Sequence, residues 1–140
     1  MLRRHLLVAG APFALAAATP RFTKGVCWAA WPIGTPYGQC IVQAAQAGFR
    51  AIEIRVEPTG ELSLASTAAD AARIGSIAAS EGIAITSLWA LTPSSPSLVS
   101  PSPEVRQQAL ALARKAIELA PALGCDSILA VPGVLGRGPR

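Results

Sequence analysis

The sequence predicts a parallel α/β fold in which strands and helices alternate in the order βαβαβαβ. Short runs rich in β-branched and aromatic residues are separated by segments with helical periodicity. Strands that alternate with helices are joined by right-handed crossovers and therefore run parallel within one sheet. The 140 residues are 51% hydrophobic and 14% charged, which supplies enough apolar material for one domain with a packed core.

The N-terminal segment, residues 1–18, has the pattern of an export signal. It begins with Arg3 and Arg4, continues with an apolar stretch over residues 6–18 and ends in small residues suited to cleavage. The adjacent arginines resemble a twin-arginine signal, so we expect a periplasmic protein, or a cytoplasmic one if the leader is not functional. At ~1.5 Å per residue the stretch covers ~20 Å of a ~30 Å hydrocarbon core, which disfavours a permanent membrane span. A buried first helix and an uncleaved anchor are the alternatives.

The first strand is expected in the run 25–31, which is rich in Val, Cys and Trp and is followed by a proline. A turn leads into the first helix, where Tyr37, Ile41 and Ala44 recur at helical spacing. Gly48 stands where a glycine ends such a helix. This segment therefore predicts the first β-α unit.

Two further helices begin at residues suited to capping. Thr67 with Asp70 three residues later forms a capping box, and Gly82 is placed to end that helix. Ser102 can accept a hydrogen bond from an otherwise unpaired amide, and Pro103 has no amide to leave unpaired at the first position. The third helix has one apolar face, formed by Val105, Ala109, Leu112, Ala116, Leu119 and Leu123.

The second strand, residues 52–57, decides which parallel fold is favoured. Ile52, Ile54 and Val56 alternate with charged residues. A central strand of a doubly wound sheet is covered on both faces and is continuously apolar. In a barrel, one face packs on helices while the other points into the lumen, so the alternation favours a barrel. An edge strand with one solvated face is the simpler alternative.

The candidate binding residues are charged or aromatic and lie near the carboxyl ends of the strands, where barrel active sites form. Charged residues at 53, 55 and 57 are expected to face the lumen, with Glu57 nearest the catalytic rim. They could bind sugar hydroxyls or orient a metal ligand, or they could neutralise one another as a buried ion network. Aromatic rings there can stack on a sugar or simply pack in the core. Because Trp28 and Trp31 are three residues apart in an extended strand, we expect at most one of them to line the site. The candidate substrate-binding residues are Trp28, Trp31, Glu53, Arg55, Glu57 and Trp89.

The stretch from Gly48 to Glu53, Gly-Phe-Arg-Ala-Ile-Glu, resembles the second-strand signature of the xylose-isomerase-like TIM-barrel family of sugar phosphate isomerases and epimerases. Residues 82–88 and 116–133 resemble that family in the same order. The resemblance implies that residues 19–133 form the N-terminal half of a (β/α)8 barrel, followed by a Gly/Arg/Pro tail at 134–140.

The resemblance also implies a sugar or sugar phosphate substrate and a divalent metal, held in the family by Glu, Asp, His and Glu of later strands. The single histidine, His5, lies in the leader, so this chain supports no such metal site and its catalytic residues stay unknown. A full barrel has ~250 residues, so we expect a truncated chain that is inactive alone. Its unpaired strand edges would favour self-association of half-barrels.

Two alternatives remain open at this point. The first is an exported carbohydrate-binding or interaction module without catalysis, which would use Trp28, Trp89 and the charged face. The second is a small doubly wound parallel sheet, with a ligand at the point where the strand order reverses. Strand order distinguishes a barrel half from a doubly wound sheet, because the strands of a barrel half run in the order 1-2-3-4, whereas the order reverses in a doubly wound sheet.

The charge and the cysteine content argue against nucleic-acid binding and against a cysteine-based metal or redox site. The chain has 12 basic and 8 acidic residues, a net charge of +4 that falls to +2 without Arg3 and Arg4. The arginines are scattered over several elements, which argues against nucleic-acid binding. The 3 cysteines are too few and too widely spaced for a metal or redox motif.

Overall fold

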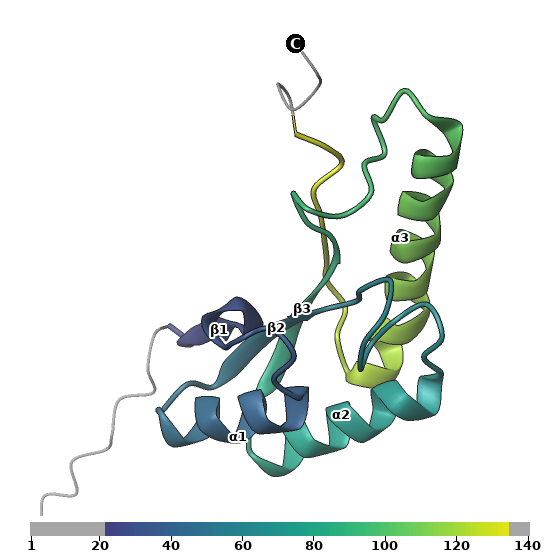
Figure 1. Ribbon diagram of the computed structural model, residues 1–140. Coiled ribbons are helices and arrows are strands. Elements are labelled where there is room, and N and C mark those ends of the chain that lie inside the picture. Colours follow the sequence, from purple (N-terminus) through teal and green to yellow (C-terminus); the bar gives the residue numbers. More distant parts are fainter. Residues whose placement is uncertain (1–21, 135–140) are drawn as a thin grey trace, which may run out of the picture.

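The computed structural model describes residues 22–134, which form a parallel sheet with helices on one side (Figure 1). The predicted leader, residues 1–18, lies outside the described residues, as does the tail beyond residue 134. The sheet has four strands in the order β1-β2-β3-β4, all parallel. The strands are β1 (Gly25–Cys27), β2 (Ala51–Arg55), β3 (Ala84–Leu91) and β4 (Ile128–Ala130). The order never reverses, so the barrel half is confirmed and the doubly wound sheet is wrong.

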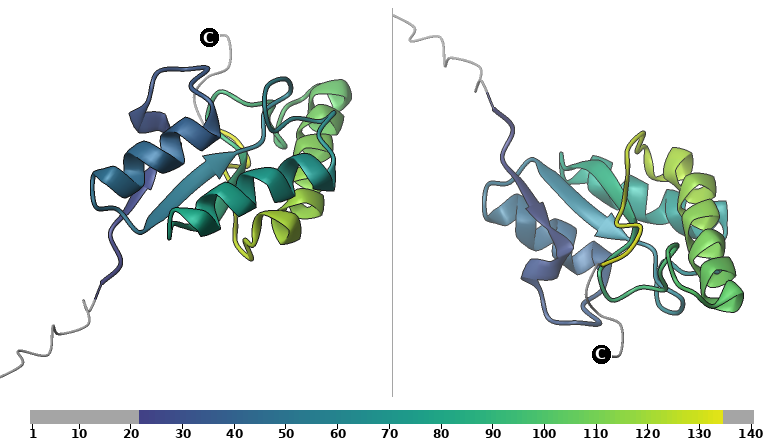
Figure 2. Two further views of the ribbon diagram at one scale, coloured as in Figure 1. Left: turned by 90° about the horizontal axis from the view of Figure 1, so that it is seen from below. Right: turned by 90° about the horizontal axis from the view of Figure 1, so that it is seen from above.

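Three helices, α1 (Tyr37–Gln46), α2 (Ala68–Ser80) and α3 (Pro103–Leu123), connect the strands. Seen from two opposite sides, all three lie against the same face of the sheet, and no helix covers the other face within the described part of the chain (Figure 2). We call these the helix-covered face and the open face.

The helices begin and end where the sequence predicts. Thr67 and Asp70 make the reciprocal capping box of α2, and the Ser102 side chain accepts a hydrogen bond from the third amide of α3. Gly48 and Gly124 adopt the left-handed conformation just after α1 and α3, with φ of 77° and 73°. Local sequence therefore determines the frame that holds the strands.

The alternation along β2 separates its two faces as predicted. Ile52, Ile54 and Val56 are completely or almost completely buried under the helices, while Glu53 and Arg55 are only partly buried on the open face. The strand register aligns the remaining open-face side chains beside them. The open-face residues are Cys27, Glu53, Arg55, Ser87, Trp89 and Leu129.

Three strands differ in their bounds from the sequence expectation, and β2 ends at Arg55 instead of residue 57. The first strand ends at Cys27, and a short 3-10 helix, η1 (Trp28–Ala30), replaces the rest of the predicted run. The third strand continues to Leu91, so it contains Trp89. Within residues 22–134, no helix is both long and apolar enough to cross a membrane.

Candidate functional site

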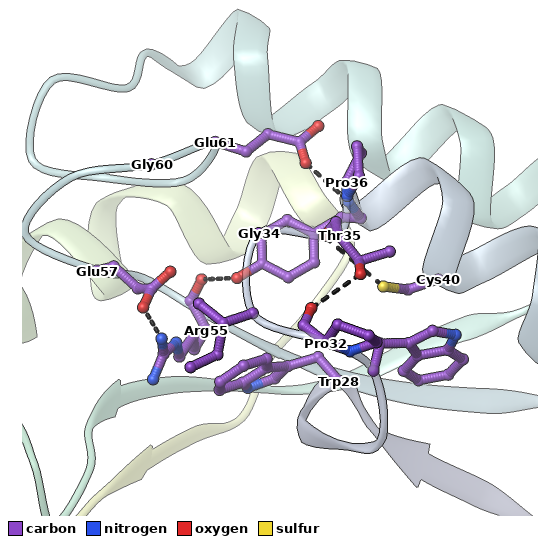
Figure 3. A pocket seen from close by; sticks show the side chains of 13 residues that line it. Trp28, Pro32, Gly34, Thr35, Pro36, Cys40, Arg55, Glu57, Gly60 and Glu61 are labelled. Carbon is purple, nitrogen blue, oxygen red and sulfur yellow. Dashed lines mark hydrogen bonds and ion pairs between the residues drawn. The ribbon is translucent and has the colours of Figure 1, made fainter.

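A cavity of about 420 Å³ lies at the carboxyl ends of β1 and β2, beside the start of α1 (Figure 3). Its walls come from the β1–α1 loop and the β2–α2 loop, which is where a barrel of this kind places its active site. Its lining includes the side chains of Trp28, Trp31, Tyr37, Arg55, Glu57 and Glu61.

Both tryptophans of the β1–α1 segment line this cavity, so the expectation that at most one would do so is wrong. That expectation assumed an extended strand, in which residues three apart point to opposite faces. The 3-10 turn at Trp28–Ala30 breaks the alternation. The Trp31 indole then donates a 2.6 Å hydrogen bond to the Gln43 side chain of α1.

Arg55 lies at the centre of the polar wall. Its guanidinium carbon sits 3.9 Å from the centre of the Trp28 ring, and the same group forms an ion pair with Glu57. The Arg55 side chain is 15% exposed, and this burial lowers the pKa of its guanidinium. Its backbone carbonyl accepts a 2.8 Å hydrogen bond from the Tyr37 hydroxyl. Burial raises the pKa of Tyr37 to about 12, so Tyr37 donates as a neutral phenol.

Glu53 is separate from this cluster. Its carboxylate accepts a hydrogen bond from the Ser87 hydroxyl of β3 and does not line the cavity. On its other side Glu53 neighbours Cys27, where burial is the main cause that raises the pKa of the thiol. The alternative of a three-membered ion network holds only in part: Arg55 pairs with Glu57, and Glu53 accepts a hydrogen bond from Ser87 across the sheet instead.

Trp89 lies beside Arg55 on the open face, in register with it, but outside the cavity lining. Its indole N–H is buried without a hydrogen-bond partner among residues 22–134. The Trp28 indole N–H and the Arg55 Nε–H are in the same condition. Three buried N–H donors on and beside this wall of the site therefore make no hydrogen bond within residues 22–134.

A second, smaller cavity of about 130 Å³ shares Arg55 and Glu57 with the β3–α3 loop. There, the Thr92 hydroxyl is within hydrogen-bond distance of the hydroxyls of Ser94 and Ser95. The Arg55–Glu57 pair is thus the wall between two hollows at the same end of the sheet.

Sequence reasoning missed Tyr37 and Glu61 as site residues. Glu61, from the β2–α2 loop, accepts a 2.7 Å hydrogen bond from the Tyr37 backbone amide at the start of α1. The signal available in the sequence was the residue before the helix, Pro36, which has no side chain able to cap it. A helix that begins without a local cap needs an acceptor from elsewhere in the fold.

The divalent metal that the resemblance implies does not fit the residues described. Across residues 22–134, no three His, Cys, Asp or Glu side chains are grouped so that they could hold a metal ion. The acidic groups nearest the cavity are each engaged otherwise, with Ser87, Arg55 or the Tyr37 amide. His5 lies outside the described residues.

Residues 41–140 match the family model described as xylose isomerase-like TIM barrel. A search of the curated proteins gives no significant match. Among solved structures, the chain resembles D-psicose 3-epimerase in the presence of D-fructose, with 20% identity and a TM-score of 0.60. It also resembles D-psicose 3-epimerase with D-tagatose from Clostridium cellulolyticum H10, with 22% identity and a TM-score of 0.60.

Each of these two alignments covers 76% of this chain but 36% of the solved one, so the chain spans about a third of their length. Such low identity establishes a shared fold. The family match covers most of the sequence, from the middle of α1 through β2, α2, β3, α3 and β4. The chain belongs to the xylose isomerase-like TIM barrel family.

Proposed function

We propose that this is a sugar isomerase/epimerase-like protein whose cavity at the ends of β1 and β2 binds a small sugar. The observation that carries the proposal is the composition of the walls: two indoles stand beside a fixed guanidinium and two carboxylates. Indole faces stack on the apolar faces of sugar rings, while charged groups bind hydroxyls. The two similar epimerase structures, one in the presence of D-fructose and one with D-tagatose, support the same class of ligand.

In this proposal the aromatic and the charged side chains of the cavity contribute different contacts to the sugar. Trp31 offers a ring that its bond to Gln43 holds in place, and Arg55 stacked on Trp28 offers guanidinium N–H groups. Glu57 pairs with Arg55, and its carboxylate can accept hydrogen bonds from hydroxyls.

We propose that the described residues bind the sugar without converting it. Isomerases and epimerases of this family typically use a metal, and residues 22–134 hold no group of ligands for one. Inversion at one carbon of a sugar also needs a proton-transferring group on each face of that carbon. Both carboxylates of the cavity come from the segment that follows β2, and both are already engaged, Glu57 with Arg55 and Glu61 with the Tyr37 amide.

We further propose that two copies of the chain associate through their sheet edges. The two edge strands, β1 and β4, are each three residues long and run in the same direction. All residues of β4 are exposed, including Ile128 and Leu129. A two-fold axis parallel to the strands would place β4 of one copy beside β1 of the other and bury these apolar side chains. Sedimentation equilibrium tests this, because a monomeric mass at micromolar concentration contradicts it.

Export to the periplasm is proposed from residues 1–18, by the pattern of Arg3, Arg4 and the apolar stretch after them. Fractionation followed by N-terminal sequencing tests it. A mature N-terminus shortly after residue 18 in the periplasm agrees with export, and an intact N-terminus in the cytoplasm contradicts it.

The test of the proposed function is calorimetric titration of the full chain with D-fructose and D-tagatose. Glu57→Gln keeps the shape of the side chain but removes the charge that holds Arg55, and we expect about tenfold weaker sugar binding. Glu81→Gln is the matched control, because Glu81 is exposed at the end of α2 and is absent from the cavity lining. Failure of the wild type to bind either sugar, or equal affinities of the two variants, contradicts the proposal.

A further inference from the structure

The amino end of α1 opens onto the cavity. Thr35, Pro36 and Tyr37 all line it, and α1 is a 10-residue helix with no acidic residue in its first turn. Unpaired amides and the helix dipole make such an end attractive to anions, above all to phosphate groups. Left to itself, this end would favour a phosphorylated ligand.

A carboxylate of the chain already occupies that position. Glu61 Oε2 accepts the hydrogen bond of the Tyr37 amide at 2.7 Å, and the dashed line in Figure 3 marks this contact between the β2–α2 loop and α1. The other oxygen, Oε1, lies 3.6 Å from the Arg73 guanidinium of α2. Glu61 is thereby held over the helix end from two sides.

The charges of the lining residues also disfavour an anionic ligand. Its lining contains one guanidinium, Arg55, and two carboxylates, Glu57 and Glu61. Arg55 is already paired with Glu57, and Arg73 stands outside the lining with a 58% exposed side chain. The lining residues therefore carry a net negative charge, and a phosphate ester would face the Glu61 carboxylate, which only the exposed Arg73 offsets, where it would otherwise find amide donors.

We propose that Glu61 is a specificity-determining residue that restricts this cavity to uncharged sugars and excludes sugar phosphates. The inference rests on the proposed sugar binding and adds the charge class of the ligand. Glu61 acts as an internal anion at the helix end, so a neutral sugar keeps access to the indoles and to Arg55 while a phosphate group is repelled. The exclusion rests on three features, which are the amino end of α1, the Glu61 carboxylate held over it, and the pairing of Arg55 with Glu57.

The experiment compares D-fructose, D-fructose 6-phosphate and inorganic phosphate by calorimetric titration of the full chain. The wild type should bind D-fructose at least about tenfold more tightly than its phosphate ester, and should not bind inorganic phosphate measurably. Glu61→Gln retains an oxygen that can accept from the Tyr37 amide, so the cap and the fold are kept while the charge is removed. We expect this variant to gain about five- to tenfold in its affinity for the phosphate ester relative to its affinity for D-fructose.

Glu81→Gln, which removes the same charge from an exposed position, should behave as the wild type. Glu61→Ala, checked for its helical circular dichroism, removes the acceptor as well and should bind inorganic phosphate. If the wild type binds D-fructose 6-phosphate as tightly as D-fructose, or if Glu61→Gln leaves the ratio unchanged, the selectivity is overturned while sugar binding stands. If the wild type binds phosphate but no sugar, both proposals are overturned.

Discussion

The helix-covered face and the open face of one sheet differ in almost every property. Along β2, Ile52 and Ile54 are fully buried under the helices, whereas Glu53 and Arg55 on the opposite face form polar contacts and stay partly exposed. The first face supplies stability through apolar packing, and the second supplies donors, acceptors and charge at the cavity. A substitution on the helix-covered face should therefore change the stability of the fold, whereas a substitution on the open face should change ligand binding.

The largest expected effect comes from truncating the helix-covered face. Ile54→Ala removes a fully buried side chain from the core and should lower the free energy of unfolding by roughly 2–5 kcal/mol. Leu129→Ala, on the open face and 38% exposed in a single copy, should cost the dissociated monomer less than about 1 kcal/mol. Urea denaturation of both variants measures the contrast, and similar losses from the two would break the distinction between the faces.

The second effect is pH-dependent and concerns Tyr37, the one tyrosine of the chain. Burial raises the pKa of Tyr37 to about 12, above the value of about 10 in an unfolded chain. The neutral phenol is therefore favoured by folding, so its contribution is complete below pH ~10 and is lost as the pH rises toward 12, by roughly 2–3 kcal/mol.

Ultraviolet titration of the folded protein, with the urea-unfolded protein as control, measures both midpoints. A folded midpoint at the unfolded value would show that the hydroxyl is exposed and that its bond to the Arg55 carbonyl is absent.

A third effect separates two helical glycines. A Cβ at Gly75 would lie 3.0 Å from the Ala122 carbonyl oxygen where α2 crosses α3, while a Cβ at Gly38 would meet only the flexible end of Ile77 at 3.3 Å. Gly75→Ala should destabilise by about 1–3 kcal/mol through overpacking. Gly38→Ala should be neutral or gain up to about 1 kcal/mol from helix propensity. Thermal unfolding ranks the two variants, and a stabilising Gly75→Ala contradicts the close packing of α2 on α3.

The smallest effect is at the surface, in the capping box of α2. Hydrogen bonds from Thr67 lower the pKa of Asp70, so the carboxylate stabilises the fold above its unfolded pKa of about 3.9, and this contribution is lost as the pH falls below that value. Asp70→Asn should therefore reduce the acid-induced fall in melting temperature. Identical pH profiles for wild type and variant would leave the capping box without a stabilising role.

The parts of the fold that depend on local sequence were predictable. The alternation in β2, the capping box at Thr67 and the glycine after α3 each act within a few residues. The site was predictable in part, because Arg55 and Glu57 line the cavity as expected while Glu53 bonds to Ser87 instead.

The remaining features depend on contacts between loops that are distant in sequence. The 3-10 turn that places both Trp28 and Trp31 in the cavity replaces a run that has strong strand propensity. Glu61 caps a helix that begins 24 residues before it, and no local pattern marks such a partner. Tertiary contacts of this kind override propensity, and they complete the site.

The most direct test of the sugar site compares Trp28 and Trp89, the two indoles beside Arg55, by titration with D-fructose. Only Trp28 lines the cavity, although both stand beside Arg55. Trp28→Ala should weaken binding by more than about tenfold, and Trp89→Ala, with its fold verified by circular dichroism, should stay within about twofold of the wild type. Equal losses, or a larger loss from Trp89→Ala, would contradict the claim that the cavity at the ends of β1 and β2 is the sugar site.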